Sequence, residues 1–241
     1  MGESFRTLDA HERLIVALDV NSAPQARQIV ATVGDSVTTF KVGKQLFTAE
    51  GPQVIRDLVA SGRKVFLDLK FHDIPNTVGK AVVEACKLGV SMLTVHAAGG
   101  ARMLKAAVEA AAASESRPLI LAVTVLTSLR DEDMPEIGVA GRVVDQALRM
   151  AALARAQGCR GVVTSAHEVR ELRRELGEGF AIVVPGVRPA GSDLGDQERV
   201  ATPAEAWGAG ASHIVVGRPI TASADPARAA REILGELQVT V

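Results

Sequence analysis

Apolar and polar positions follow two alternating patterns along the chain. Short runs rich in β-branched residues predict strands, and between them lie longer segments with apolar residues at helical spacing. The predicted strands are Leu14–Asp19, Thr38–Val42, Lys64–Leu69, Ser91–His96, Leu119–Val125, Gly161–Ser165, Ala181–Pro185 and His213–Gly217. The predicted helices are Ala23–Val33, Pro52–Ser61, Ile74–Leu88, Arg102–Ala113, Val143–Ala156, His167–Leu176, Pro203–Gly210 and Pro226–Leu237.

Strict alternation of strand and helix predicts parallel pairing, because each crossover needs a helix to return the chain. Eight strands within 241 residues favour a single-domain α/β protein with a closed (β/α)8 (TIM) barrel over residues 13–241. Residues 1–12 are expected to form an N-terminal arm, either ordered or disordered. A doubly wound open sheet is the alternative, but Asp19-Val20-Asn21-Ser22 stands where a glycine-rich nucleotide loop would be expected.

Composition narrows the possible partners. The chain has 27 Lys and Arg against 28 Asp and Glu, so neither a nucleic-acid surface nor a polybasic membrane patch is expected. Aromatic residues are 3% of the chain and Tyr is absent, which disfavours recognition by stacking. No apolar run approaches the ~18 residues of a membrane span, and we expect a cytoplasmic protein. Cys86 and Cys159 are expected to be small buried thiols.

Polar residues recur where the predicted strands end, which is the end of a (β/α)8 barrel at which active sites form. They are Asp19, Lys41, Asp68, Lys70, His96, Thr127, Ser128, Arg188, Gly217 and Arg218. Core packing alone does not produce such a series.

The densest charge cluster follows the third strand. Residues two apart in a strand share a face, so Asp68 and Lys70 are expected to project the same way. Lys41 and Asp19 can join them, giving alternating carboxylates and ammoniums that keep one another ionised. A salt-bridge network that only closes the barrel mouth is the alternative. Buried ion networks stabilise a fold poorly, so a functional role is favoured.

A divalent metal is a further alternative for this cluster. Asp68, Asp73 and His96 could supply ligands, but two neighbouring lysines would repel the cation. We therefore predict no metal site. His96 is expected to be a hydrogen-bonded wall residue, and His72 to be structural or merely near the site.

The eighth strand leads into Gly217-Arg218, which suits an anion. A glycine lets a ligand approach the backbone, and the guanidinium offers a fork of donors that fits phosphate. Arg188 and Gln197 frame the long irregular stretch 188–202 on the same side. The alternative is a turn with a solvated arginine.

At these residues the sequence resembles the orotidine 5′-phosphate decarboxylase family, in its bacterial, stand-alone form. The segment from Asp68 to Thr77 is similar to the family's D-x-K-x-x-D-I-P-N-T signature, and the likeness extends from Leu14 to Leu237. Further matching segments are Ala17–Asp19, Phe40–Gly43, Thr124–Ser128, Pro185–Pro189, Gly195–Gln197 and Val216–Ile220. The resemblance implies cofactor-free conversion of orotidine 5′-monophosphate to UMP and carbon dioxide in pyrimidine biosynthesis.

The resemblance also implies catalytic roles. Lys70 matches the donor that protonates C6 of the pyrimidine, and Asp68 matches the carboxylate beside the departing one. Lys41 and Asp73 match the rest of the charge network. Asp73 would serve the neighbouring subunit's site, and Thr77 would contact the substrate at the dimer interface, which implies a homodimer.

The remaining implied contacts hold the substrate. Asp19 and Lys41 match residues that contact the ribose hydroxyls, and Thr127 and Ser128 match residues that read the pyrimidine edge. The implied phosphate grip consists of Arg188, Gln197, Gly217 and Arg218, with the 188–202 loop as a closing lid.

Two alternatives stay open. A magnesium-dependent sugar-phosphate decarboxylase or synthase shares the barrel and the D-x-K-x-x-D pattern, but carries an acidic metal ligand where this chain has Lys41. A non-catalytic nucleotide-binding barrel would typically lack one charged member of the cluster. Here all members are present.

Overall fold

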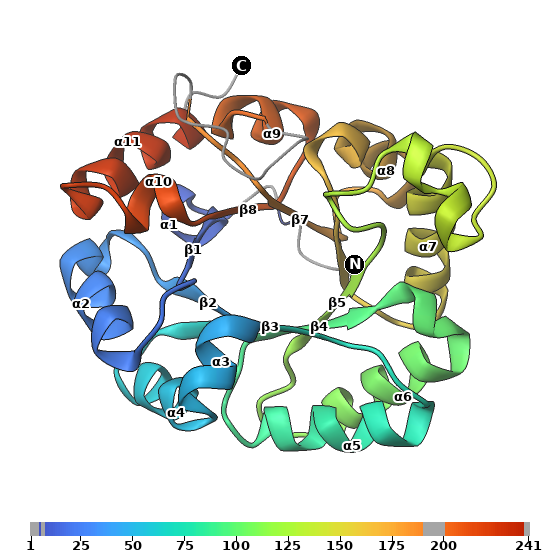
Figure 1. Cartoon of the computed structure of the whole chain (residues 1–241), viewed down its shortest axis with the longest axis horizontal. Coiled ribbons are helices and arrows are strands. Elements are labelled where there is room, and N and C mark those ends of the chain that lie inside the picture. The colour runs from blue at the N-terminus through green and yellow to red at the C-terminus, as the bar shows by residue number, and fades with distance from the viewer. Residues whose placement is uncertain (1–4, 6–7, 190–200, 239–241) are drawn as a thin grey trace.

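The computed structural model describes residue 5 and residues 8–189 and 201–238, and within them the chain forms a closed parallel barrel (Figure 1). The strands follow one another in sequence order around the barrel, and β8 pairs with β1. They are β1 Leu14–Ala17, β2 Thr39–Gly43, β3 Lys64–Phe71, β4 Met92–His96, β5 Leu119–Val123, β6 Gly161–Val163, β7 Ala181–Pro185 and β8 His213–Val216. The predicted (β/α)8 barrel is confirmed, and the open-sheet alternative is wrong.

A ring of helices surrounds the strands (Figure 1). All eight predicted helices are present, as α2 Ala23–Val33, α4 Gln53–Ala60, α5 Pro75–Cys86, α6 Gly100–Ala112, α7 Val143–Ala156, α8 Val169–Leu176, α9 Pro203–Ala209 and α11 Pro226–Gln238. The sequence reading missed three short helices, α1 Ala10–Arg13, α3 Lys44–Glu50 and α10 Arg218–Thr221. These are too short to show a clear apolar period, since each spans two turns or fewer.

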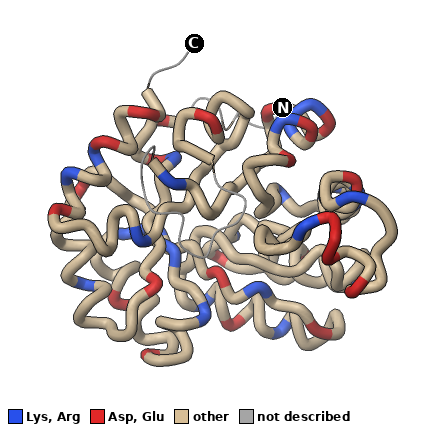
Figure 2. Tube along the Cα trace, turned by 45° about the horizontal axis from the view of Figure 1, so that its top comes forward, with Lys and Arg blue, Asp and Glu red and all other residues tan. Residues whose placement is uncertain are grey.

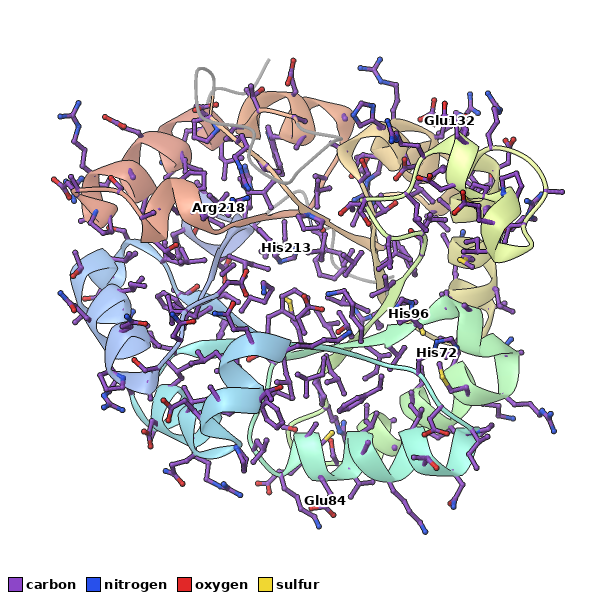
Figure 3. The ribbon with its side chains drawn as sticks, in the orientation of Figure 1. His72, Glu84, His96, Glu132, His213 and Arg218 are labelled. Atoms are coloured by element: carbon purple, nitrogen blue, oxygen red, sulfur yellow. The ribbon has the colours of Figure 1, made fainter. Side chains whose placement is uncertain are left out.

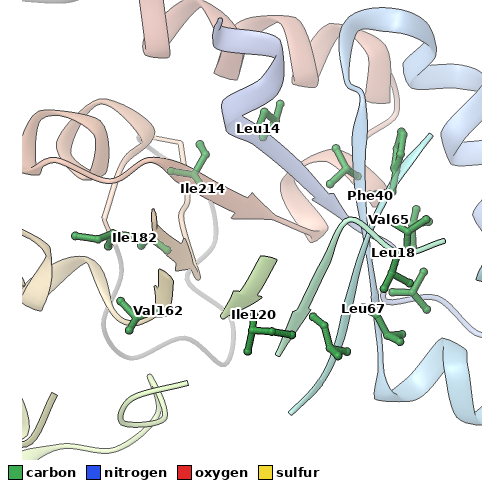
Figure 4. Close-up of a cluster of buried hydrophobic side chains, with 14 of the residues drawn as sticks. Leu14, Leu18, Phe40, Val65, Leu67, Ile120, Val162, Ile182 and Ile214 are labelled. Carbon is green, nitrogen blue, oxygen red and sulfur yellow. The ribbon is translucent and has the colours of Figure 1, made fainter. Parts of the chain in front are cut away.

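Strand residues alternate between the barrel interior and the surrounding helices. The outward set, which includes Leu14, Phe40, Val65, Ile120 and Ile214, packs beneath the helices (Figure 4). The inward set is a separate cluster of Ile15, Ala17, Phe66, Met92, Leu121, Val123, Val163, Ala181, Val183 and Val215. This period of two fixes the direction of the polar residues near the strand ends.

Phe5, near the N-terminus, packs at the floor of the barrel, where the strands begin. Phe5 packs against the inward cluster, and its ring lies edge-on to His213 with centroids 6.0 Å apart. The hydroxyl of Ser212 lies 3.0 Å from His213 Nδ1. Burial lowers the pKa of His213 to about 4, so this imidazole is neutral at pH 7. The Arg13 guanidinium stacks 3.7 Å from the centroid of the Trp207 ring.

Charges of both signs are spread over the outer helices (Figure 2), in keeping with a net charge of −1. None of the described helices combines the length and apolar character that crossing a membrane requires. Cys86 and Cys159 are free and buried, as expected, and burial raises the pKa of Cys159 to about 12.

Candidate active site

A cavity of about 510 Å³ opens at the carboxyl ends of the strands. Its wall contains residues from strands all around the barrel except β4. The predicted site residues that line it are Asp19, Lys41, Asp68, Lys70, Thr127, Arg188, Gly217 and Arg218. Other lining residues include Gln45, Phe66, Val125, Leu126, Pro185 and Val215. The cavity is therefore apolar at its base and charged at its rim.

Four of the predicted residues form a row of alternating charge. Lys70 Nζ lies 2.8 Å from both carboxylate oxygens of Asp68. Lys41 Nζ lies 2.8 Å from Asp19 Oδ1 and 3.9 Å from Asp68 Oδ2, so it stands between the two carboxylates. The predicted meeting of these side chains is confirmed. We call Asp19, Lys41, Asp68 and Lys70 the charge row.

The central carboxylate of the row stays ionised although it is nearly buried. Burial of Asp68 by itself would raise its pKa. The charges of Lys70 and Lys41, together with hydrogen bonds from Lys70 and Thr94, lower the pKa by more than burial raises it. The net result is a pKa below the ordinary range for aspartate. Asp68 is thus a fixed negative charge inside the cavity.

The route by which Asp68 and Lys70 meet differs from the predicted one. A regular strand was expected, but β3 bulges: Leu67 pairs with Leu93, whereas the next pair is Phe71 with Val95. Lys70 sits in this bulge with φ at +54°, in the left-handed region, which costs a non-glycine residue roughly 1–2 kcal/mol. The sequence could not show this, because the letters of 68–71 also fit a regular strand.

Thr94 on β4 lies directly beside the bulge and was not predicted as a site residue. Its hydroxyl donates to Asp68 Oδ1 at 2.9 Å and accepts the backbone N–H of Lys70 at 2.9 Å. The residue is completely buried. The one sequence signal for Thr94 is its place in the strand. It lies two residues after the inward-facing Met92, so its side chain also points into the barrel.

Gly43, at the end of β2, is a second residue whose role the sequence reading missed. A Cβ atom there would lie 2.9 Å from Lys41 Nζ and 3.0 Å from Asp19 Oδ1. The backbone itself makes no demand for glycine, because φ is −94°. The absence of a side chain therefore leaves room for the Asp19–Lys41 pair.

Asp73 and Thr77 lie outside the cavity wall. Both are exposed at the start of α5, and Asp73 Oδ1 accepts the N–H of Ile74 at 2.6 Å. Ile74 itself is 65% exposed, a high value for a large apolar side chain. Ser128 is exposed beside Thr127 and is not part of the wall.

Arg188 and Arg218 bring positive charge to the side of the cavity near β7 and β8. Arg218 begins α10 directly after Gly217 and is exposed, whereas Arg188 is buried. The Arg188 N–H donates to the carbonyl of Ala201 at 2.9 Å, which joins the two ends of the predicted lid. Gln197 lies outside the described residues.

His96 and His72 lie on the opposite side of the barrel from Arg218 (Figure 3). Their ring centroids are 5.3 Å apart. Burial is the main cause that lowers the pKa of His96 to about 4, and the neighbouring charges of His72, Lys70 and Lys44 lower it as well. A neutral His96 is a poor proton donor at pH 7. The residue does not belong to the described cavity lining, so its expected place in the wall is not confirmed.

Comparison with known proteins places this geometry among related chains. The model of the orotidine 5'-phosphate decarboxylase / HUMPS family matches residues 12–233. An orotidine 5'-phosphate decarboxylase of Sodalis glossinidius is 53% identical over 98% of this chain and 94% of its own. An orotidine 5'-phosphate decarboxylase of Halorhodospira halophila is 54% identical over 93% of this chain and 95% of its own. The crystal structure of orotidine 5'-phosphate decarboxylase from Lactobacillus acidophilus superposes with a TM-score of 0.84 at 40% identity, covering 95% of this chain and 100% of that one.

Proposed function

This chain belongs to the orotidine 5'-phosphate decarboxylase / HUMPS family, and from that premise we propose that it converts orotidine 5′-monophosphate to UMP and carbon dioxide without a cofactor. The observation that carries the proposal is the charge row, with Lys70 Nζ held 2.8 Å from Asp68 inside a substrate-sized cavity. The enzyme is a carboxy-lyase of pyrimidine biosynthesis.

The reaction needs electrostatic help at one carbon. The bond between C6 of the pyrimidine and its carboxylate breaks, carbon dioxide leaves, and the electron pair remains on C6. Lys70 carries a positive charge toward that position and then donates a proton to C6, after which solvent reprotonates its amine. Stabilising charge that develops in the transition state, in a site closed to water, is the largest contribution that such a residue can make.

Asp68 and Lys41 give Lys70 its place. We assign Asp68 to the position beside the departing carboxylate, where its fixed negative charge also holds the Lys70 ammonium. We assign Asp19 and Lys41 to the ribose hydroxyls, because their contact at 2.8 Å brings a donor and an acceptor together at the cavity rim.

The far side of the cavity suits the rest of the nucleotide. We assign the phosphate to Arg218, Gly217 and Arg188, with Gln197 contributing from the lid, and the pyrimidine edge to Thr127 and Ser128. Binding energy from a phosphate remote from C6 can be used for closure and for orienting the reacting carbon.

We further propose a homodimer in which Asp73 and Thr77 reach the neighbouring subunit's cavity. Both are exposed at the start of α5, outside their own cavity wall, next to the exposed apolar side chain of Ile74. A cytoplasmic location is proposed on the composition alone.

The magnesium-dependent sugar-phosphate reaction is the weaker alternative within the same barrel. Lys41 Nζ occupies the position between Asp19 and Asp68 at which a cation bridging two carboxylates would lie. Among the described residues, the group of three that could converge on one metal ion is Asp9, His11 and Glu12, on the surface and away from the cavity. The lysine between the two carboxylates of the cavity therefore favours the metal-free reaction.

The test is turnover in the presence of a chelator. Purified protein is mixed with orotidine 5′-monophosphate and EDTA, and the change in ultraviolet absorbance is followed as UMP forms. We expect catalytic loss of substrate that EDTA does not slow. A folded protein that binds UMP without turnover would contradict the proposal, and activity on sugar phosphates restored by magnesium would establish the alternative.

A further inference from the structure

The bulge in β3 creates a local problem that one side chain solves. Between the pairs Leu67–Leu93 and Phe71–Val95, β3 contains Asp68, Leu69 and Lys70, whereas β4 contains Thr94 alone. The regular ladder cannot satisfy the backbone groups of the extra residues, and an unpaired buried N–H is strongly unfavourable. The Lys70 N–H is instead bound by the Thr94 hydroxyl at 2.9 Å.

The same hydroxyl also holds the partner of the Lys70 ammonium. It donates its one proton to Asp68 Oδ1 at 2.9 Å, and that oxygen lies 2.8 Å from Lys70 Nζ. Thr94 thus contacts both the backbone of Lys70 and the carboxylate that its side chain binds. A hydroxyl can donate and accept at once, so these two bonds do not compete with each other.

Strain makes this support necessary. Lys70 has φ at +54°, and a non-glycine residue keeps such a conformation only where its surroundings determine it strongly. Thr94 is completely buried and β-branched, so its χ1 is restricted and its oxygen has a fixed position. Thr94 on β4 therefore fixes the backbone of Lys70 directly and its ammonium through Asp68.

We propose that Thr94 is a positioning residue for the decarboxylation, one that sets the Lys70 ammonium through the bulge backbone and through Asp68. This inference rests on the proposed function. Loss of the hydroxyl leaves the Lys70 N–H without its acceptor and Asp68 without one donor, and the ammonium moves away from C6. The phosphate and ribose contacts, which Thr94 does not touch, keep their geometry.

The decisive comparison is Thr94→Val against Thr94→Ser. Valine keeps the branched shape and removes the hydroxyl, so we expect kcat to fall about 10- to 100-fold, while the Kd for UMP changes less than about threefold. Serine keeps the hydroxyl, so we expect kcat within about threefold of the unaltered protein. A residue that only packs the core would give the reverse order, because valine preserves its volume and serine does not.

Thr124→Val is the matched control for removing a buried hydroxyl. Thr124 is buried, and its hydroxyl donates to the carbonyl of Val163 at 3.1 Å rather than to a member of the charge row. We expect a lower melting temperature and an unchanged kcat. If Thr94→Val fails to fold, Thr94→Ala removes the hydroxyl without placing a methyl group against the Lys70 N–H, and the same fall in kcat is expected.

The inference fails if a folded variant without the hydroxyl keeps the kcat of the unaltered protein, or if Thr94→Ser loses as much activity as Thr94→Val. Its failure is distinct from failure of the proposed function. If only the inference about Thr94 fails, the unaltered protein still turns over orotidine 5′-monophosphate in the same assay. If the proposed function fails, the unaltered protein shows no turnover.

Discussion

The two ends of the barrel differ in the charge state of their buried polar groups. At the mouth, the charge row places two carboxylates and two ammoniums side by side around a cavity. At the floor, His213 is buried and neutral, with Ser212 beside its Nδ1 and the Phe5 ring edge-on to its imidazole. The strands that connect the two ends are the same.

The difference lies in what partners each group has. Desolvation disfavours any charged form, and at the floor it acts on His213 with little opposing charge, so the pKa falls. At the mouth the same desolvation of Asp68 is outweighed by Lys70 and Lys41, so the charge persists. Retaining charge in a buried place contributes little to stability. The mouth should therefore control rate, and the floor should control stability.

The strongest test of this contrast is Lys70→Ala. Removing the charge and the proton donor together should lower kcat by at least about 10⁴-fold, with the Kd for UMP almost unchanged. Single-turnover decay of orotidine 5′-monophosphate measures the loss, with Lys105→Ala on the exposed face of α6 as the control. Normal turnover by a folded Lys70→Ala protein would refute the assignment.

Arg218→Ala should come next. Loss of a charged donor to phosphate should raise KM by about 10- to 100-fold and change kcat less. Steady-state kinetics over a wide substrate range separates the two constants. Arg228→Ala removes an exposed arginine on α11 that pairs with Glu232 at 2.8 Å, and it should leave both constants unchanged. An equal effect of the two substitutions would remove Arg218 from the site.

Gly43→Ala should produce a smaller effect at the mouth. The added Cβ would lie 2.9 Å from Lys41 Nζ, so the Asp19–Lys41 pair must move by a few tenths of an ångström. We expect kcat/KM to fall about tenfold while the melting temperature stays nearly constant. Gly208→Ala, where nothing lies within 4 Å, is the control. Full activity in Gly43→Ala would show that the pair tolerates displacement.

The floor should affect stability and leave the rate almost unchanged. Because the folded pKa of His213 is about 4, below its ordinary 6.5, the unfolded chain binds the extra proton first as the pH falls. Stability from this group is complete above pH 6.5 and is lost progressively as the pH falls to about 4. The charged groups that act on it are Glu12, Lys64 and Arg13.

His213→Asn removes that proton while keeping a polar atom near Ser212. The free energy of unfolding of the variant, measured by denaturant titration from pH 7 to pH 4, should fall less steeply than that of the unaltered protein. Decarboxylation at pH 7 should be the same in both. Parallel stability curves would show that His213 does not take up a proton on unfolding, and a large loss of kcat would break the contrast between mouth and floor.

Periodicity was enough to predict the barrel and the inward direction of Lys41 and Asp68, whereas the place of Lys70 in the charge row depends on the bulge. The period of two that places Phe40 and Val42 beneath the helices also turns Lys41 inward, and the order of the strands does the rest. The bulge was not predictable, because Asp68 to Phe71 also fits a regular strand. Thr94 was missed because it stands within an apolar run, and Phe5 because an arm without a periodic pattern does not show where it packs.

One property of the cavity wall bears on how a nucleotide would approach it. The four members of the charge row cancel, whereas Arg188 and Arg218 leave the described wall with a formal charge of +2, from four positive and two negative residues. The whole chain, by contrast, has a net charge of −1. The long-range field of the cavity therefore comes from the arginine side. With the site roles proposed above, this field would orient an incoming nucleotide with its phosphate first. The pyrimidine ring would reach the neutral row last, where short-range contacts take over from diffusion.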